Sequence, residues 1–274
     1  MIKYIFCDLD GTLMSDDKTI SDDNIISIKK AYDSGIKFIP CTGRFDSYGG
    51  ILEALGIEKS AKDYSIAAGG SVIKQNDGTI IKGTYIDNDA TVKLIDLLIK
   101  YDSDFFLNGV ERRMSFGSGK QMDAIFNGKS PYPRKKNADS KELYDIASKD
   151  RIIKIQFAQA DKKYMKIITD AMANEFSDYV EFSLSEGEMI EVTKKGCNKE
   201  HAFLDLIALL NINIEETLVI GDNGNDLGVL KRGGLSACPN SAIDIVKENV
   251  TYVSPFDNNH SAVSDIIENL IFKK

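Results

Sequence analysis

Residues that mark several specialised functions are scarce in this chain of 274 residues. It has two histidines, neither with the spacing of a metal-binding pair, and four cysteines with no Cys-x-x-Cys motif. We therefore expect neither a zinc site nor a disulfide framework. No apolar run is long enough to cross a membrane, and a net charge of −8 disfavours a nucleic-acid-binding surface. Without a signal peptide, the reducing cytoplasm is the expected compartment.

The length and the pattern of apolar residues predict the fold class. A chain of this length with 43% hydrophobic residues can bury one large or two moderate cores. Strand-like and helix-like segments alternate at both ends, which predicts an α/β fold with a parallel sheet wrapped by helices. In such folds functional residues gather at the carboxyl edge of the sheet.

Local signals place several elements near the N-terminus. Ser21 is a suitable N-cap for a helix that ends at Gly35. A strand is predicted at residues 64–67. It is followed by a hairpin whose turn is the Asn-Asp-Gly sequence at residues 76–78.

Two carboxylates directly follow the first strand-like run, residues 2–7. Alternation along the chain puts Asp8 and Asp10 on the same face, and Gly11 allows a sharp turn after them. One such carboxylate can attack phosphorus, while the other protonates the leaving oxygen and then activates water. A simple turn is the alternative. A calcium loop is excluded because the position that needs a glutamate is Thr19.

Two further segments offer partners for a phosphate group. Residues 36–44 form a second strand-like run that ends in Thr42-Gly43-Arg44, whose donors can bind phosphate oxygens. Lys199 begins a helical pattern, and its ammonium group can neutralise phosphate charge. Alone, each also fits an ordinary turn or a solvated lysine.

A third strand-like run, residues 217–220, ends in a glycine-containing turn with two acids. Asp222 and Asp226 have the character of metal ligands, although a helix cap would explain them equally well in isolation. The joint occurrence of all four segments makes coincidence improbable.

In order and in local sequence, the four segments resemble the signature motifs of the haloacid dehalogenase (HAD) superfamily of phosphohydrolases. Thr42-Gly43-Arg44 and residues 195–199 and 221–226 are similar to the Cof-type branch, which consists mostly of phosphatases of sugar phosphates and other small phosphomonoesters. The resemblance spans nearly the whole chain. It implies a Rossmann-like parallel-sheet core with an inserted α+β cap domain.

The resemblance also implies a role for each motif residue. Asp8 would be the nucleophile and Asp10 the general acid and base. The metal would be held by the carboxylates of Asp8 and Asp222 and the backbone carbonyl of Asp10, with Asp226 in support. The predicted catalytic residues are Asp8, Asp10, Thr42 and Lys199; the phosphate- or substrate-binding residues are Thr42, Gly43, Arg44, Lys199 and Asn225; and the metal-binding residues are Asp8, Asp10, Asp222 and Asp226.

The charge of this site independently predicts a bound cation. Two carboxylates about 4 Å apart repel by about 4 kcal/mol at an effective dielectric constant near 20, and four would gather here. Ligation by oxygen alone favours a hard ion. Mg²⁺, which keeps several waters and bridges to phosphate, is the expected cofactor.

The chain departs from the Cof-type pattern at two places near these motifs. Gly69-Gly70-Ser71 stands where the branch has Asn-Gly-Ala, so no asparagine contact to the substrate is expected there. Glu200 replaces a common glycine after Lys199. Neither change touches a predicted catalytic position.

No catalytic motif lies between about Gly83 and Glu188. Helices are predicted at residues 91–101 and 162–176, and a strand at residues 152–157. We therefore predict a catalytic core at residues 1–82 and 189–274 and an inserted cap at residues 83–188. Closure of such a cap would exclude water, and its residues would select the substrate.

The sequence therefore predicts a cytoplasmic phosphoric monoester hydrolase that depends on Mg²⁺. Its substrate would be a small phosphorylated metabolite, such as a sugar phosphate, hydrolysed through an aspartyl phosphate on Asp8. A monomer or weak homo-oligomer is expected, with no nucleic-acid or membrane partner. A sugar phosphomutase and a non-catalytic sensor of a phosphorylated metabolite are the alternatives.

Overall fold

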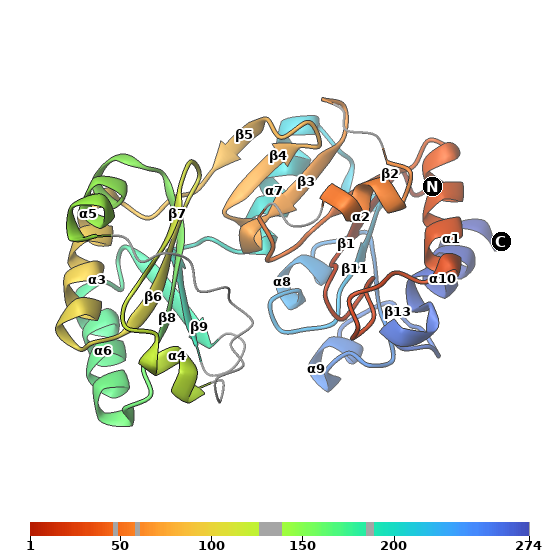
Figure 1. The fold of residues 1–274 in the computed structure, drawn as a ribbon. Helices are drawn as coiled ribbons and strands as arrows, with labels where there is room; N and C mark the ends of the chain where they lie inside the picture. Colours follow the sequence, from red (N-terminus) through yellow and green to blue (C-terminus); the bar gives the residue numbers. More distant parts are fainter. Residues whose placement is uncertain (46–48, 58–60, 126–138, 185–188, 274) are drawn as a thin grey trace. The chain divides into compact units, whose positions relative to one another are not determined.

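The computed structural model divides the chain into two compact units (Figure 1). Met1–Gly83 and Asn198–Lys274 form the first, here called the core unit, and Thr84–Cys197 form the second, the inserted unit. The structure describes all residues except 46–48, 58–60, 126–138, 185–188 and 274. No helix in the described part of the chain is both long enough and apolar enough to cross a bilayer.

A five-stranded parallel sheet is the centre of the core unit, in the order β13-β12-β11-β1-β2. β1 pairs with β2 on one side and with β11 on the other, so that Phe6 lies opposite both Ile39 and Val219. This confirms the predicted α/β class with a parallel sheet. The strands are β1 (Tyr4–Cys7), β2 (Lys37–Pro40), β11 (Thr217–Ile220), β12 (Leu235–Cys238) and β13 (Tyr252–Val253).

The direction in which the sheet is extended reverses at β1. The chain continues from β1 to β2 on one side, whereas the later strands β11 to β13 extend the sheet on the other. In an open α/β sheet, the loops at the carboxyl ends diverge at such a point and leave room for a ligand. The residues that follow β1, β2 and β11 therefore lie where a ligand site is expected.

Apolar side chains of the sheet and of the following helices form the core of this unit. Phe6 of β1 packs edge-to-face against Phe203 of α7, with ring centroids 4.7 Å apart. Ser21 Oγ accepts the amide hydrogen of Asn24, which confirms the predicted N-cap of α1. The helices are α1 (Asp22–Asp33), α2 (Gly49–Ala54), α7 (Lys199–Leu210), α8 (Leu227–Leu230), α9 (Asp244–Lys247) and α10 (Ala262–Ile267), with shorter turns η1 (Ala68–Gly70), η3 (Ile214–Glu216), η4 (Asn258–His260) and η5 (Glu268–Phe272).

A small antiparallel sheet follows β2 in the chain. It consists of β3 (Tyr64–Ala67), β4 (Val72–Gln75) and β5 (Ile80–Gly83). The strand predicted at residues 64–67 and the hairpin turn at residues 76–78 are confirmed. A parallel bridge joins Cys41 to Ile66, and the amide of Thr42 donates to the Ile66 carbonyl over 2.9 Å. The start of this sheet is thus fixed beside the end of β2.

The inserted unit is an antiparallel sheet with helices packed against it. The strand order is β7-β6-β8-β10-β9, and α3, α5 and α6 cover one side of it (Figure 1). Three predicted elements are confirmed, as α3, α6 and β8. The elements are α3 (Asn88–Lys100), β6 (Asp104–Gly109), β7 (Arg113–Phe116), α4 (Lys120–Ile125), α5 (Ser140–Lys149), β8 (Ile152–Ala158), α6 (Lys162–Glu175), β9 (Val180–Leu184) and β10 (Ile190–Lys194).

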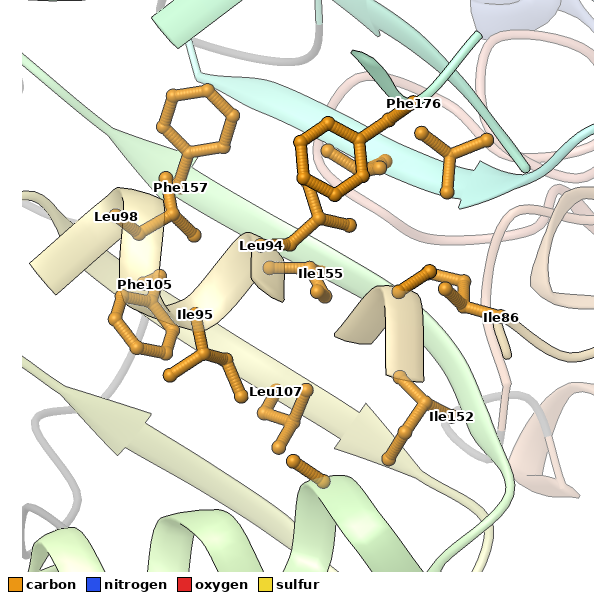
Figure 2. Packing of buried hydrophobic residues seen from close by; sticks show 14 of the residues in the cluster. Ile86, Leu94, Ile95, Leu98, Phe105, Leu107, Ile152, Ile155, Phe157 and Phe176 are labelled. Carbon is orange, nitrogen blue, oxygen red and sulfur yellow. The ribbon is translucent and has the colours of Figure 1, made fainter. Parts of the chain in front are cut away.

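The inserted unit has a hydrophobic core of its own. Figure 2 shows Leu94 and Leu98 of α3 beside Phe105 of β6 and Ile155 and Phe157 of β8. These side chains are at most 1% exposed. The unit therefore buries enough apolar surface of its own to hold its sheet and helices together.

The second boundary between the units differs from the predicted one. The sequence placed it near Glu188, which lies outside the described residues, whereas the core unit resumes at Asn198. The difference is due to β10, which pairs with β8 on one side and β9 on the other. Strand pairing of this kind joins residues far apart in the chain, and no local signal marks it.

Candidate active site

Three carboxylates meet at the carboxyl ends of β1 and β11. Asp8 directly follows β1, and Asp222 and Asp226 lie in the turn that follows β11. One oxygen atom of each lies within 4.8 Å of the others. Asp8 and Asp226 are buried, whereas Asp222 is partly exposed. The cluster thus lies at the point in the sheet where a ligand site is expected.

Lys199 supplies the positive charge of this cluster. It is the first residue of α7, and the preceding Asn198 caps the helix by accepting the amide hydrogen of His201. Its Nζ atom lies 2.6 Å from Oδ1 of Asp8 and 2.7 Å from Oδ1 of Asp226. The side chain is only 2% exposed, so these contacts are shielded from water.

Burial shifts the proton affinities within the cluster. Burial, the largest influence, raises the pKa of Asp8 well above its ordinary value, and the charge of Lys199 only partly opposes it. For Lys199, burial alone would lower the pKa, but the attraction of Asp226 and Asp8 outweighs it and raises the pKa. Lys199 is therefore charged at neutral pH.

Three carboxylates around one ammonium leave a deficit of positive charge. Ionisation of all three would leave two negative charges uncompensated in a largely buried site. The donor set consists of carboxylate oxygens alone, which suits a hard divalent cation such as Mg²⁺. Asp8, Asp222 and Asp226 are the side chains able to hold one.

Thr12 and Gly11 position Asp222. The hydroxyl of Thr12 donates to Oδ1 of Asp222 over 2.6 Å. Gly11 has φ +82°, and a Cβ atom there would lie 2.7 Å from Oδ2 of Asp222. Thr12 was not among the predicted site residues, although its place directly after Asp8-x-Asp10-Gly11 is a signal that could have identified it.

Asp226 is held in place by the backbone of its own turn. Its Oδ2 atom accepts the amide hydrogens of Asp222 and Asn223, both over 3.1 Å, while Oδ1 accepts from Lys199. A Cβ atom at Gly221 would lie 2.6 Å from Cβ of Asp226. Asp226 therefore fixes the turn and the lysine together.

Asp10 makes a separate set of contacts. Arg44 binds it through two hydrogen bonds, Nη2 to Oδ1 over 2.7 Å and Nε to Oδ2 over 2.8 Å, and Nζ of Lys18 lies 3.0 Å from Oδ1. The hydrogen bond from Arg44 is the main cause that lowers the pKa of Asp10 to about 2. The hydrogen bond from Lys18 adds to this shift, and partial burial opposes it. Lys18 was not among the predicted site residues. Among the described residues, the carboxylate cluster contains no oxygen of the Asp10 side chain.

The remaining predicted residues lie on the turns around this edge. Thr42 follows β2 and is buried, and its hydroxyl accepts the amide hydrogen of Arg44 over 3.1 Å. Gly43 and Asn225 are exposed. The structure thus brings Lys199 into contact with Asp8 and Asp226 and places Asp222 beside these two acids, and it pairs Arg44 with Asp10.

The turn η1 fixes the beginning of α7. Ala68, Gly69 and Gly70 all have positive φ, and a Cβ atom at Gly70 would lie 2.2 Å from the carbonyl oxygen of Asn198. Only glycine permits so close an approach. Gly70 therefore has a structural explanation, because it lets η1 contact the beginning of the helix that carries Lys199.

Comparisons with known proteins agree with this geometry. A family model described as haloacid dehalogenase-like hydrolase matches residues 5–267. The chain is 26% identical to a 5-amino-6-(5-phospho-D-ribitylamino)uracil phosphatase of Bacillus subtilis, over 92% of this chain and 90% of that protein. It is 23% identical to a phosphoglycolate phosphatase of Methanobrevibacter smithii, over 98% and 99% of the two chains. A solved haloacid dehalogenase-like hydrolase from Bacteroides thetaiotaomicron has a TM-score of 0.84 at 20% identity, covering 99% of this chain and 100% of the other.

Proposed function

Since this chain belongs to the haloacid dehalogenase-like hydrolase family and is a phosphoric monoester hydrolase, we propose that it cleaves small phosphomonoesters through an aspartyl phosphate on Asp8. The observation that carries the proposal is the position of Lys199 between Asp8 and Asp226. The ammonium group holds the Asp8 carboxylate at the sheet edge and provides charge for phosphoryl oxygens. We propose the reducing cytoplasm as its compartment, because all four cysteines are free thiols.

In the first step, Asp8 attacks phosphorus and the alcohol leaves. Asp8 and Asp222 would hold Mg²⁺ with the backbone carbonyl of Asp10, and Asp226 would support them; the ion would neutralise charge on the transferring phosphoryl group. Thr12 keeps the Asp222 carboxylate directed toward the cluster. The Thr42 hydroxyl donates to none of the described residues, so its proton is available for a phosphoryl oxygen.

Asp10 is proposed to act first as an acid and then as a base. In the described structure Arg44 and Lys18 keep it ionised, which suits the activation of water in the second step. A bound phosphate competes with Asp10 for Arg44, since guanidinium binds phosphate and carboxylate in the same bidentate manner. Once released from Arg44, Asp10 regains affinity for the proton that the leaving oxygen needs.

The inserted unit is proposed to be the cap that selects the substrate and excludes water during the reaction. The related proteins point to phosphorylated metabolites of low molecular mass: one is named for a ribitylamino-uracil phosphate and another for phosphoglycolate. We propose a sugar or polyol phosphate for this chain. No observation on the described residues favours the phosphomutase or the sensor.

The test is phosphate release by wild type and by Asp8→Asn from a panel of sugar phosphates, nucleotides and vitamin phosphates, with Mg²⁺ and with EDTA. We expect release that requires Mg²⁺ and is abolished by the substitution, while the protein stays folded. Asp33→Asn is the matched control, because Asp33 is 60% exposed on α1 and forms an exposed ion pair with Lys29. Turnover retained by Asp8→Asn would refute the nucleophile assignment.

A further inference from the structure

The chain after Asp10 folds back in a tight hairpin turn. The amide of Lys18 donates to the carbonyl of Ser15, and the amide of Ser15 donates to the carbonyl of Thr19, both over 3.0 Å. Hairpin loops of three residues commonly place the last of them in the left-handed conformation, a position that favours glycine. Here that residue is Lys18, with φ +65°. Backbone strain of this kind beside a site points to a function for the side chain.

The side chain of Lys18 reaches back to the start of this loop, where its Nζ atom lies 3.0 Å from Oδ1 of Asp10. Lys18 is the one cationic side chain among the five described residues other than glycine that have positive φ. Asp102 and Asn211, two of the others, are of the types that adopt this conformation most readily, because their short side chains hydrogen-bond locally. Lysine has no such local compensation, so its contact with Asp10 is the feature that sets it apart.

Contacts with η4 anchor the hairpin turn. Nδ2 of Asn258 donates to Oδ1 of Asp16 over 3.0 Å and to the carbonyl of Met14 over 3.2 Å. Oδ1 of Asn259 accepts the amide hydrogen of Asp16 over 3.0 Å, and its Nδ2 atom donates to Oδ2 of Asp16 over 3.2 Å. Lys18 therefore projects from a loop whose position is set by contacts other than its own.

The two cations that bind Asp10 divide its oxygens unequally. Arg44 binds both, through Nη2 to Oδ1 and Nε to Oδ2, whereas Lys18 binds Oδ1 alone. In the described part of the chain, Arg44 is the one hydrogen-bond donor to Oδ2. When a phosphate group takes Arg44 from Asp10, Oδ1 keeps its bond to Lys18 while Oδ2 loses its partner. Oδ2 is then the oxygen that can carry a proton.

This division suits a carboxyl group that must donate a proton. A protonated carboxyl group donates from one oxygen and accepts at the other. With Oδ1 accepting from Lys18, the plane of the group is held and the proton on Oδ2 has a fixed direction. Orientation is part of what makes a general acid effective, and such an acid contributes about 10²–10⁴-fold to the rate.

We propose that Lys18 is a positioning residue for Asp10, which it holds at Oδ1 so that Oδ2 delivers the proton to the leaving oxygen. This inference rests on the proposed phosphatase function. As Asp8 bonds to phosphorus and the bond from phosphorus to the alcohol oxygen breaks, the proton moves from Oδ2 to that oxygen and leaves Asp10 ionised. Lys18 keeps its own proton throughout. Because Lys18 is 60% exposed, its ion pair contributes little to stability, and its effect is on orientation.

The test compares kcat/KM for ribitol phosphate and p-nitrophenyl phosphate in wild type, Lys18→Met and Lys18→Arg. This parameter covers the steps up to departure of the alcohol. The alcohol of ribitol needs a proton in order to leave, whereas p-nitrophenolate leaves without one. Lys18→Met should lower kcat/KM for ribitol phosphate by about tenfold and that for p-nitrophenyl phosphate by less than about twofold. Lys18→Arg should restore most of the loss, because arginine can also donate to Oδ1.

Lys3→Met is the matched control. Lys3 is 59% exposed and pairs with Glu216 at the opposite end of β1, so this variant should hydrolyse both compounds as wild type does. An equal loss on both compounds in Lys18→Met, or a loss on neither, would overturn the inference.

Lys18→Gly tests the significance of the strained backbone. It lacks the ammonium group, as Lys18→Met does, but glycine adopts positive φ without strain. Lys18→Gly should therefore unfold at a higher urea concentration than Lys18→Met, while its kcat/KM for ribitol phosphate is as low. An equal or lower unfolding midpoint would contradict the inference, since it would remove the strain that marks Lys18.

Should wild type hydrolyse neither compound, the proposed function fails. A crystal structure of wild type with inorganic phosphate then decides separately whether Lys18 holds Asp10. Arg44 bound to the phosphate, with Lys18 still on Oδ1 of Asp10, supports the inference. Any other arrangement of the three side chains, or no bound phosphate, refutes it.

Discussion

Lys199 shows how one buried residue can organise an acidic site. Its ammonium group binds Asp8, which comes from the start of the chain, and Asp226, which lies in the turn after β11. All three are nearly inaccessible to water, so the attraction acts in a medium of low dielectric constant. The residue therefore contributes to the stability of the site as well as to the proposed chemistry.

Lys199→Met should destabilise the protein by about 3–5 kcal/mol at neutral pH, because it leaves Asp8 and Asp226 buried without their cation. Mg²⁺ should restore part of the loss by balancing the same carboxylates. Urea unfolding followed by circular dichroism, with and without Mg²⁺, measures both effects.

Lys82→Met is the control for that substitution. Lys82 pairs with Asp205 over 2.6 Å, but it is 51% exposed, and such pairs contribute about 0–1 kcal/mol. Equal losses of stability in the two variants would show that burial of the Lys199 contacts has no energetic importance.

At the scale of elements, function depends on how η1 meets the N-terminus of α7. Gly69 and Gly70 both have positive φ, at +68° and +107°, so an alanine at either position strains the backbone by about 1 kcal/mol. Only at Gly70 would the added Cβ meet the Asn198 carbonyl, whereas nothing lies within 4 Å of the position at Gly69. A comparison of alanine at the two positions therefore separates the effect of backbone strain from the effect of displacing α7.

Gly70→Ala should lower kcat by up to about a hundredfold, because a shift of α7 by about 1 Å moves Lys199 away from Asp8. Gly69→Ala should lose only the stability due to backbone strain, about 1 kcal/mol, and keep kcat near the wild-type value. Steady-state kinetics together with thermal unfolding of both variants provides the comparison. A similar kcat in the two would contradict the view that η1 positions Lys199.

At the scale of the whole molecule, every residue of the carboxylate cluster belongs to the core unit, although the inserted unit separates Asp8 from the others in sequence. The stability of the core unit should therefore be linked to pH and to divalent cations through Asp8. Its raised pKa means that the folded state keeps a proton that the unfolded state releases near pH 4.

Without divalent cations, the free energy of unfolding of wild type should fall relative to that of Asp8→Asn as pH rises from about 4 to about 8. The sign follows because the folded state binds more protons than the unfolded state over this range, and the slope is at most about 1.4 kcal/mol per pH unit. Mg²⁺ should remove the difference, since it favours the ionised carboxylate. A parallel course of the two pH profiles without Mg²⁺ would contradict the pKa shift of Asp8.

The sequence alone predicted the α/β class, the helix after Ser21, the hairpin at residues 76–78 and the family. These follow from local signals: N-caps, turn residues, apolar runs and short motifs around Asp8, Lys199 and Asp222. Each signal lies within a few residues, so no knowledge of distant contacts is needed.

The folded structure was needed to reveal the partners of those residues. It showed that Thr12 binds Asp222, that Lys18 and Arg44 bind Asp10, and that β10 belongs to the inserted unit. These facts depend on strand register and on the approach of side chains from different turns, and neither is encoded in any short stretch of sequence.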